Sequence, residues 1–385
     1  MASTAVACAK ADIPRFALQR VPFETLLTTC LKLLPDTKKV KIHVLDPLLD
    51  SRWEEFVARH PSASVFHQTG WLQALVRTYG YEPYVLTGMP FGEPLENGIL
   101  VCRVSSWITG ARLVSLPFSD HCEPLLRECD AAEEFVNWMH DACDLQHWRY
   151  VELRPLSAPC RRENSLRPDS SYWFHELDLE PSLDEIFRRF HKNSFQRKVQ
   201  RAEREGLTYE AGRSERIMDE FYRLLLNTRR RHGLFPQPRA WFENLLECMG
   251  EKLQIRLARK NAVAIAAMLT LRHGSSVVYK YGGSNENFHN LGGMPFLFWR
   301  LVEESKALGI RKIDLGRTDL SNEGLIAFKD RLGATRRLLT YYRYTRASKR
   351  KVATLSASWA LRQFFALLPE EVCSLAGRIL YKHLG

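Results

Sequence analysis

One order of predicted elements occurs twice along the 385-residue chain, and this recurrence constrains the fold more than any single motif. In the first half, helical patterns precede a run of strands within 84–116. A helix over 131–145 and a closing strand over 150–154 complete the unit. Alternating apolar residues bounded by turn residues predict the strands, and the wider apolar spacing predicts the helices.

The second half repeats the order. Strands between 253 and 281 are joined by turns at Lys260-Asn261 and His273-Gly274, and a helix over 295–308 precedes a strand over 312–315. The chain therefore predicts a mixed α/β fold of two tandem units, each a largely antiparallel sheet flanked by helices. A single α/β domain with an unrelated N-terminal extension is the alternative. A continuous helix over 183–205 is also expected, followed by helices over 215–231 and 239–249.

These boundaries predict two domains, which suits the length of the chain. Four segments follow: a poorly determined N-terminal lead-in over 1–39, a first domain over 40–175, a second over 176–345 and a basic, amphipathic tail over 346–385. A basic run within 341–351 leads into this tail, and such a run beside an apolar helix can contact an anionic membrane surface. A terminal helix packed on the body explains the tail equally well.

Charge and cysteine content restrict the partners and the compartment. The formal net charge of +11 favours an anionic partner, whether nucleic acid, acidic lipid or phosphorylated sugar. Nine cysteines without a C-x-x-C pair indicate a reducing compartment and no zinc ribbon. Neither a secretory signal nor an apolar run long enough to span a bilayer is recognisable. We expect a cytoplasmic protein, peripheral at the inner membrane face if the tail binds lipid, with unknown oligomeric state.

A glycine pair at the start of the helix in the second unit is the first candidate binding feature. Gly292 and Gly293 expose backbone N–H groups at the positive end of the helix dipole, where an anion is stabilised. The loop matches neither a P-loop nor a dinucleotide motif, and an ordinary turn explains the glycines as well. Arg197 and Lys198 lie on a basic helix and form a second candidate phosphate site. An ordinary solvent-exposed charged face of a helix explains them as well.

Three side-chain types nearby suit carbonyl chemistry. Tyr279 and Tyr281 alternate with a lysine, so both phenols are expected on one face of their strand. A phenol or a lysine such as Lys329 can stabilise developing negative charge, and Asp314 can orient an amine. Cys122, in the Ser-Asp-His-Cys run, is a weaker candidate nucleophile, because contiguous residues cannot adopt triad geometry. No spacing of histidines with acids or cysteines defines a metal site.

Several segments together resemble the FemAB-like acyltransferases, a GNAT-related family with two GNAT-type domains in tandem. The segments are QRKVQRAEREGL, YKYGGSN, HNLGGMPFLFWRLVEESKALGI, IDLG and GLIAFKDRLG, within 183–344. FHQTGWLQAL and LPFSDHCEPLL in the first half resemble the family less specifically. The chain departs from the peptidoglycan enzymes of the family, because the second of these loops lacks Arg-Gly-Pro and no coiled-coil arm is present.

The resemblance implies transfer of an acyl or aminoacyl group from acyl-CoA or aminoacyl-tRNA, with no tightly bound cofactor or metal. The acceptor would be an amine of a small-molecule or lipid-linked glycan precursor in peptidoglycan or exopolysaccharide synthesis, and tRNA is a further expected partner. The expected roles are catalytic for Tyr281, Lys329 and Asp314, donor binding for Gly292, Gly293, Asn290, Arg197 and Lys198, and acceptor binding for Tyr279, Arg317 and Asp120. The alternative is a catalytically silent adaptor that binds nucleic acid or an anionic membrane.

Overall fold

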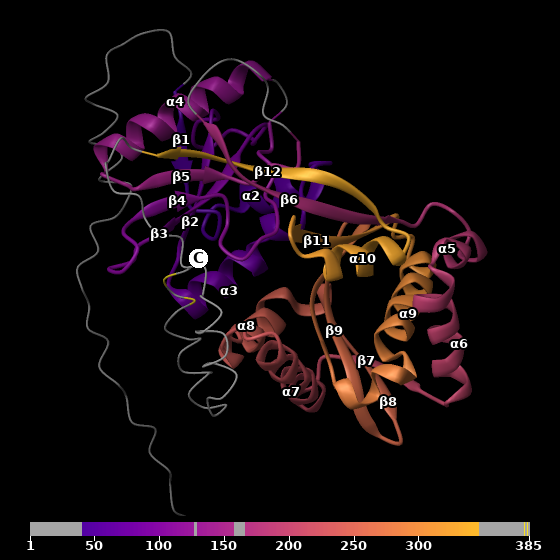
Figure 1. Cartoon of the computed structure of the whole chain (residues 1–385). Helices are drawn as coiled ribbons and strands as arrows, with labels where there is room; N and C mark the ends of the chain where they lie inside the picture. Colours follow the sequence, from indigo (N-terminus) through magenta and orange to yellow (C-terminus); the bar gives the residue numbers. More distant parts are fainter. Residues whose placement is uncertain (1–40, 127–128, 158–165, 346–380, 382, 384–385) are drawn as a thin grey trace, which may run out of the picture. The chain divides into compact units, whose positions relative to one another are not determined.

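The computed structural model describes residues 41–126, 129–157, 166–345, 381 and 383. Within them the strands form one twelve-stranded sheet in the order β1-β2-β3-β4-β5-β12-β6-β11-β10-β9-β8-β7 (Figure 1). Neighbouring strands are antiparallel except at β4 with β5 and β10 with β11, which are parallel. The structure is therefore the mixed, mostly antiparallel α/β sheet that the sequence predicts.

The first half of the sheet is built from the chain up to residue 153. Its strands are β1 His43–Leu45, β2 Glu82–Thr87, β3 Ile99–Val104, β4 Arg112–Val114 and β5 Tyr150–Leu153. Its helices are α2 Ser51–Arg59, η1 Val65–His67, α3 Thr69–Tyr79 and α4 Cys129–Leu145. Apart from α2, η1 and α3, which lie between β1 and β2, the order along the chain is four antiparallel strands, helix α4 and the parallel strand β5.

The second half repeats this order. Its strands are β7 Thr208–Gly212, β8 Leu253–Lys260, β9 Val263–His273, β10 Ser276–Ser284 and β11 Lys312–Asp319. Its helices are α5 Leu183–Arg189, η2 Lys192–Gln196, α6 Arg197–Arg204, α7 Glu215–Arg231, α8 Arg239–Met249, η3 Gly250–Lys252, η4 Glu286–Leu291, α9 Gly293–Ala307 and α10 Glu323–Arg331. Helix α9 occupies the place that α4 has in the first half.

Two long strands that the sequence did not predict join the halves. Strand β6, Arg167–Asp178, follows β5 along the chain but pairs with β11 of the second half. Strand β12, Thr335–Thr345, comes after β11 and α10 but pairs with β5 of the first half. The two also pair with each other at the centre of the sheet (Figure 1). Each half is thus completed by a strand from the other part of the chain. We call β6 and β12 the exchanged strands.

Local sequence explains most element ends. The β8–β9 hairpin turns at Asn261 and Ala262, both with positive φ (48° and 66°), one residue later than predicted. The single helix predicted over 183–205 is wrong, because Phe190 adopts an extended backbone and ends α5. The side-chain amide of Gln196 donates to the Phe190 carbonyl oxygen at 2.7 Å, which satisfies a group that the break leaves free.

Apolar layers cover both faces of the second half. Helices α7 and α8 pack with α3 on one face, where the rings of Trp71 and Trp241 meet edge to face at 5.2 Å. Helices α5, α6 and α9 cover the other face, with Phe296 and Leu301 among the buried residues. The strands between them are buried on both sides, so a polar side chain there requires a partner.

The predicted membrane-contacting tail lies largely outside the described residues. Of its last part, Tyr381 accepts a hydrogen bond at its carbonyl oxygen from the Tyr81 hydroxyl at 2.7 Å, and the His383 Nδ1 lies 3.0 Å from the Ser106 Oγ. Among the helices that the structure describes, none combines the length and apolar character needed to cross a membrane.

Candidate functional site

The parallel strands β10 and β11 pair over three positions and then separate. Their register runs from Ser276 opposite Lys312 to Val278 opposite Asp314. Beyond this point both strands change register against their other neighbours, at Tyr279/Tyr281 in β10 and between Asp314 and Arg317 in β11. The two strands therefore border a wedge that opens toward the end of β11. We call it the β10–β11 wedge.

A carboxylate from the first half enters this wedge. Asp120, in the loop after β4, accepts a hydrogen bond from Lys280 Nζ at 2.6 Å. Its Oδ2 would lie 3.0 Å from a Cβ at Gly316, whose φ is +70°, so only glycine suits that position. Burial raises the pKa of Asp120, but the charges of Lys280 and Arg317 outweigh burial and lower it overall.

Lys329 of α10 reaches the same wedge. Its side chain is 3% exposed, and Nζ donates to the carbonyl oxygens of Gly316 at 3.0 Å and Arg317 at 3.2 Å. Burial lowers the pKa of Lys329 to about 8, although Asp120 and Asp314 partly oppose this shift. The buried amine is therefore a cation at neutral pH that loses its proton more readily than an exposed lysine does.

Asp314, at the point where the strands separate, is tied to the first half. Its Oδ2 lies 2.7 Å from His121 Nε2, and its Oδ1 accepts the backbone N–H of Gly316 at 2.6 Å. Both side chains are buried, at 3% exposure for His121 and 6% for Asp314. The structure thus brings Asp314, predicted from the sequence, together with His121, to which the sequence analysis gave no catalytic role.

Arg317 completes the cluster. Its guanidinium lies over the rings of Tyr172 and Tyr341, 4.3 and 5.2 Å from the centroids, and donates to the Tyr341 hydroxyl at 2.9 Å. That hydroxyl donates in turn to the Asp120 carbonyl oxygen at 2.6 Å. Of the predicted acceptor-binding residues, Arg317 and Asp120 therefore lie together, held in place by the exchanged strands β6 and β12.

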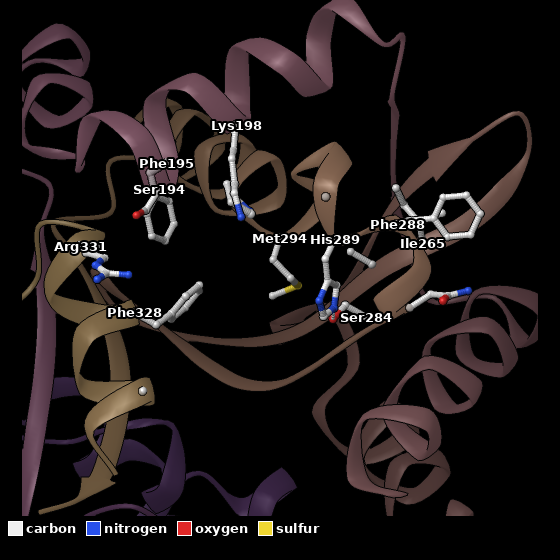
Figure 2. Close-up of a pocket in the computed structure, with 15 residues that line it drawn as sticks. Ser194, Phe195, Lys198, Ile265, Ser284, Phe288, His289, Met294, Phe328 and Arg331 are labelled. Carbon is white, nitrogen blue, oxygen red and sulfur yellow. Dashed lines mark hydrogen bonds between the residues drawn. The ribbon is translucent and has the colours of Figure 1, made fainter. Parts of the chain in front are cut away.

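A pocket with a volume of 390 Å³ lies at the N-terminus of α9 (Figure 2). Lys198 reaches from α6 toward Met294, and Arg331 lies at the side where Phe195 and Phe328 approach each other. The first N–H groups of α9 have no acceptor within their helix. The pocket therefore combines two cations and a helix N-terminus with apolar walls. We call it the α9 pocket.

The predicted donor-binding residues divide around this pocket. Lys198 and Gly293 line it. Gly292, with φ +78°, packs against the Lys198 backbone so closely that a Cβ would lie 2.5 Å from the carbonyl oxygen. Arg197 and Asn290 are exposed and are not among its lining residues. Arg331 was not predicted from the sequence; it is two residues after Lys329 on α10 and so points to a different side of that helix.

Comparisons with known proteins identify this part of the chain. Residues 189–330, which hold both strands of the wedge and the lining of the α9 pocket except Arg331, match the family model "Acetyltransferase (GNAT) domain". The crystal structure of FemX superposes with a TM-score of 0.62 at 13% identity, covering 80% of this chain and 97% of that chain. The matched segment is a GNAT acyltransferase domain, in a chain with a FemX-like fold. No curated protein sequence matches it.

Two further solved structures share the fold. The C-terminal domain of a putative lysylphosphatidylglycerol synthetase from Agrobacterium fabrum has a TM-score of 0.50 at 16% identity, covering 77% of this chain and 92% of that one. A conserved protein of unknown function from Bacteroides thetaiotaomicron has a TM-score of 0.52 at 15% identity, covering 79% and 99%. At these identities the likeness concerns the fold alone.

The tyrosine pair of the GNAT domain is arranged differently from the prediction. The register shift between Tyr279 and Tyr281 is a β-bulge, so the two rings lie on opposite faces of β10. Tyr279 packs edge to face on Phe298, whereas the Tyr281 hydroxyl accepts a hydrogen bond from Trp241 Nε1 at 2.9 Å. The expectation of a shared face is therefore wrong, and Tyr281 lies in the core beneath α8.

Cys122 does not have the environment of a nucleophile in this acyltransferase. Its Sγ lies 3.6 Å from His67 Nε2, but that nitrogen is also 2.9 Å from the Glu123 carbonyl oxygen, to which it donates. Burial raises the pKa of the Cys122 thiol and lowers the pKa of His67 to about 3. A neutral thiol beside a neutral imidazole that donates elsewhere lacks a base, so the structure argues against the cysteine hypothesis.

A second cavity, of 490 Å³, lies where the two halves of the acyltransferase meet. His121 and Asp314 line it, together with the beginnings of β10 and β11 and the segment after α2. Its walls are rich in hydroxyl and charged groups: Ser62, Ser64, Ser157, Ser275, Ser276, Arg59, Glu123, Glu176, Lys312 and Arg337. We call it the junction cavity.

Among the described residues no group of histidine, cysteine and acidic side chains is arranged to hold a metal ion.

Proposed function

We propose that the chain transfers an acyl group from an acyl-CoA thioester to an amine of a cell-envelope or exopolysaccharide precursor, with aminoacyl-tRNA as the alternative donor. The observation that carries the proposal is the α9 pocket. All of its lining residues except Arg331 lie inside the segment that matches the GNAT family model, and the same segment carries the buried Lys329.

The α9 pocket suits a phosphate-bearing donor. The N–H groups at the start of α9, Lys198 and Arg331 supply positive charge for a pyrophosphate. An apolar wall, formed by Phe195, Phe328 and Met294, suits the pantetheine chain that links the phosphates of CoA to its thioester. An aminoacyl-tRNA would present a phosphate and an ester to the same groups, so the donor is decided by experiment.

The wedge suits the acyl carbonyl. The amine nitrogen attacks the carbonyl carbon, a C–N bond forms and the C–S bond of the thioester breaks, with the electron pair leaving on sulfur. Negative charge develops on the carbonyl oxygen, and a buried ammonium stabilises it far more than one in water. Lys329 is that ammonium in our proposal, and the ion pair of Lys280 with Asp120 keeps the wedge polar.

The acceptor class rests on the FemAB-like resemblance and on the FemX-like fold. In this proposal Asp120 and Arg317 orient the acceptor from the buried cluster, and a lipid-linked precursor would bring the chain to a membrane surface. Contact through residues 346–380 would add to that attraction, because the segment follows a basic run. A cytoplasmic location belongs to the same proposal.

A thermal-shift panel tests the donor. We expect acetyl-CoA to raise the melting temperature, because a ligand that binds only the folded state stabilises it by about 2.7 kcal/mol at one hundred times its Kd. A rise with aminoacyl-tRNA alone would assign the other donor. No rise with either, together with salt-sensitive binding of RNA or DNA, would contradict the proposal and favour an adaptor.

A variant of Lys329 tests the chemistry once the donor is known. We expect Lys329→Met to lower turnover about 10²- to 10³-fold while the donor still raises the melting temperature. Lys306→Met is the matched control, because Lys306 Nζ also donates to backbone carbonyl oxygens, those of Leu179 and Pro181, both at 2.8 Å. Equal turnover of wild type and Lys329→Met would remove Lys329 from the mechanism.

A further inference from the structure

His121 and Asp314 form a buried dyad whose members come from different halves of the chain. The imidazole is carried by the loop after β4, and the carboxylate by β11 at the apex of the wedge. The rings of Phe66 and Phe174 contact the imidazole edge to face, at 5.2 Å and 5.5 Å between centroids. These two rings and Asp314 fix the orientation of the imidazole plane.

The hydrogen bond to Asp314 decides which nitrogen of His121 carries the proton. A carboxylate accepts and does not donate, so Nε2 holds the hydrogen and, in the neutral imidazole, Nδ1 keeps its lone pair. Nδ1 is buried and has no hydrogen-bond partner among the described residues. A buried acceptor without a donor costs free energy, and such exceptions concentrate at functional sites.

The dyad lies between the junction cavity and the wedge. His121 and Asp314 line the cavity. Along β11, Asp314 is two residues before Gly316, whose carbonyl oxygen accepts Lys329 Nζ at 3.0 Å. Along the loop, His121 follows Asp120, which pairs with Lys280 inside the wedge. His121 and Asp314 therefore connect the wall of the junction cavity with the residues of the wedge.

We propose that the junction cavity holds the acceptor, a hydroxyl-rich primary amine of the amino-sugar class, and that His121 Nδ1 accepts the proton from its nitrogen. This inference rests on the proposed function. The serine hydroxyls and the charged groups of the cavity wall provide donors and acceptors for several hydroxyl groups, and the volume of 490 Å³ is within the usual range for a small-molecule site.

The proton transfer balances with the acyl transfer. As the amine nitrogen bonds to the acyl carbon, its proton passes to Nδ1 and the imidazolium is stabilised by the Asp314 carboxylate. The C–S bond breaks, and the sulfur leaves with the electron pair and takes a proton from solvent. The imidazolium returns its proton to solvent when the amide product leaves. Asp314 is a positioning residue in this step, since it acts through His121.

The tautomer and the binding of an amine are tested together. In ¹⁵N-histidine NMR spectra of the full chain, with His121→Gln used to assign the signal, we expect a protonated Nε2 and an unprotonated Nδ1. Glucosamine is the probe amine, and we expect it to shift the Nδ1 resonance. A protonated Nδ1 in the neutral ring, or no shift with glucosamine at any soluble concentration, would overturn the inference.

Turnover tests the catalytic role. With acetyl-CoA as donor and glucosamine as acceptor, we expect His121→Gln to lower kcat about 10²- to 10⁴-fold, while acetyl-CoA raises the melting temperature as in wild type. Added imidazole should partly restore turnover to His121→Gly, which a purely structural histidine would not show. His140→Gln is the control, because His140 lies on α4, stacked on Tyr344 with 3.9 Å between ring centroids.

The results separate this inference from the proposed function. If acetyl-CoA stabilises the protein and wild type and His121→Gln acylate glucosamine equally, the inference fails and the acyltransferase assignment stands. If acetyl-CoA and aminoacyl-tRNA both leave the melting temperature unchanged, the proposed function fails whatever the NMR spectra show.

Asp314→Asn tests the positioning role. The asparagine keeps an acceptor for His121 Nε2 but removes the charge that stabilises the imidazolium, so we expect kcat to fall while the KM for glucosamine is unchanged. An effect confined to KM would contradict this role.

Discussion

The two halves of the sheet each contain a pair of parallel strands that begin to separate, but only one pair encloses a site. In the first half, β4 and β5 pair at Leu113–Val151 and Val114–Glu152. Beyond that point the chain closes the gap itself: the Ser115 N–H donates to the Glu152 carbonyl oxygen at 2.8 Å, and the Cys122 N–H donates to the Arg154 carbonyl oxygen at 2.7 Å. The β10–β11 wedge instead receives Asp120 from this same loop.

The buried charged groups of the two halves also differ: those of the first half are paired with each other, and those of the second half border the wedge. In the first half, Glu152 is bound by Arg154 at 2.9 Å and by Arg343 at 2.6 Å, and Arg154 also donates to the Leu116 carbonyl oxygen at 2.6 Å. That network ties the Glu152 carboxylate, through Arg154, to the backbone of the loop after β4. In the second half, Lys329 Nζ bonds only to carbonyl oxygens among the described residues, and the acids near it, Asp120 and Asp314, pair with Lys280 and His121. One copy has thus become a support that delivers Asp120 and His121 to the other.

The largest effect that this comparison predicts is on stability. We expect Arg154→Met to lower the free energy of unfolding by about 3–5 kcal/mol, because it removes one of the two arginines from a buried carboxylate and leaves the Leu116 carbonyl oxygen without its donor. Urea unfolding would measure the change. Arg103→Met is the control, since its ion pair with Glu82 is partly exposed and should cost no more than about 1 kcal/mol. Equal losses would contradict the contrast between the halves.

The two buried networks should also respond to pH, in different pH intervals. The pKa of Lys329 is about 8 in the folded chain against an ordinary 10.5, so between these values the unfolded chain binds more protons and stability rises with pH. Relative to Lys329→Met, wild type should gain up to roughly 3 kcal/mol over this interval.

Glu152 gives a rise of stability with pH on the acid side instead. Burial raises its pKa, but Arg154 and Arg343 outweigh burial and lower it overall, so its contribution is present at neutral pH and is lost as pH falls through the folded pKa. Unfolding curves at several pH values would check both signs. A gain in alkali that Lys329→Met retains would contradict the assignment to Lys329.

A smaller effect is expected in the α9 pocket. Replacing Lys198 and Arg331 together by alanine should raise the KM for the donor at least about tenfold, equivalent to about 1.4 kcal/mol, with the sheet unaffected. Arg204→Ala on the same helix is exposed and lies outside the pocket, so it should leave the KM unchanged. The same rise in both variants would indicate a general charge effect rather than a pocket.

The smallest effect concerns Tyr281. We expect Tyr281→Phe to cost about 1 kcal/mol of stability, because Trp241 Nε1 loses its acceptor, and to leave turnover within about twofold. A loss of turnover beyond tenfold without loss of stability would restore the catalytic role predicted from the sequence.

The sequence predicts local elements well and long-range pairing poorly. The 215–231 and 239–249 helices are confirmed at the predicted bounds, because their apolar spacing is regular. Strand β6 was missed because its first residues, such as Pro168 and Asp169, disfavour strands, and only its pairing with β11 and β12 holds it extended. The repeated order of elements nevertheless predicted the fold class, a mixed and mostly antiparallel α/β sheet, correctly.

The candidate site shows the same limit. Lys329, Asp314 and Asp120 were selected from local patterns, and the structure brings all three to one wedge. The bulge that separates Tyr279 from Tyr281 is invisible in an alternating sequence. His121 was not selected for catalysis because its partner is 193 residues away, a contact that no local spacing reveals.

The exchanged strands also determine when the protein can finish folding during synthesis. The first half cannot complete its sheet when residue 153 leaves the ribosome, because the strand that pairs with β5 begins at Thr335. Until then β5 keeps an open edge, which is a template for wrong pairing with other chains. We expect a nascent chain that stops before β12 to need chaperone protection, and the finished chain to acquire both halves of its sheet in one late step.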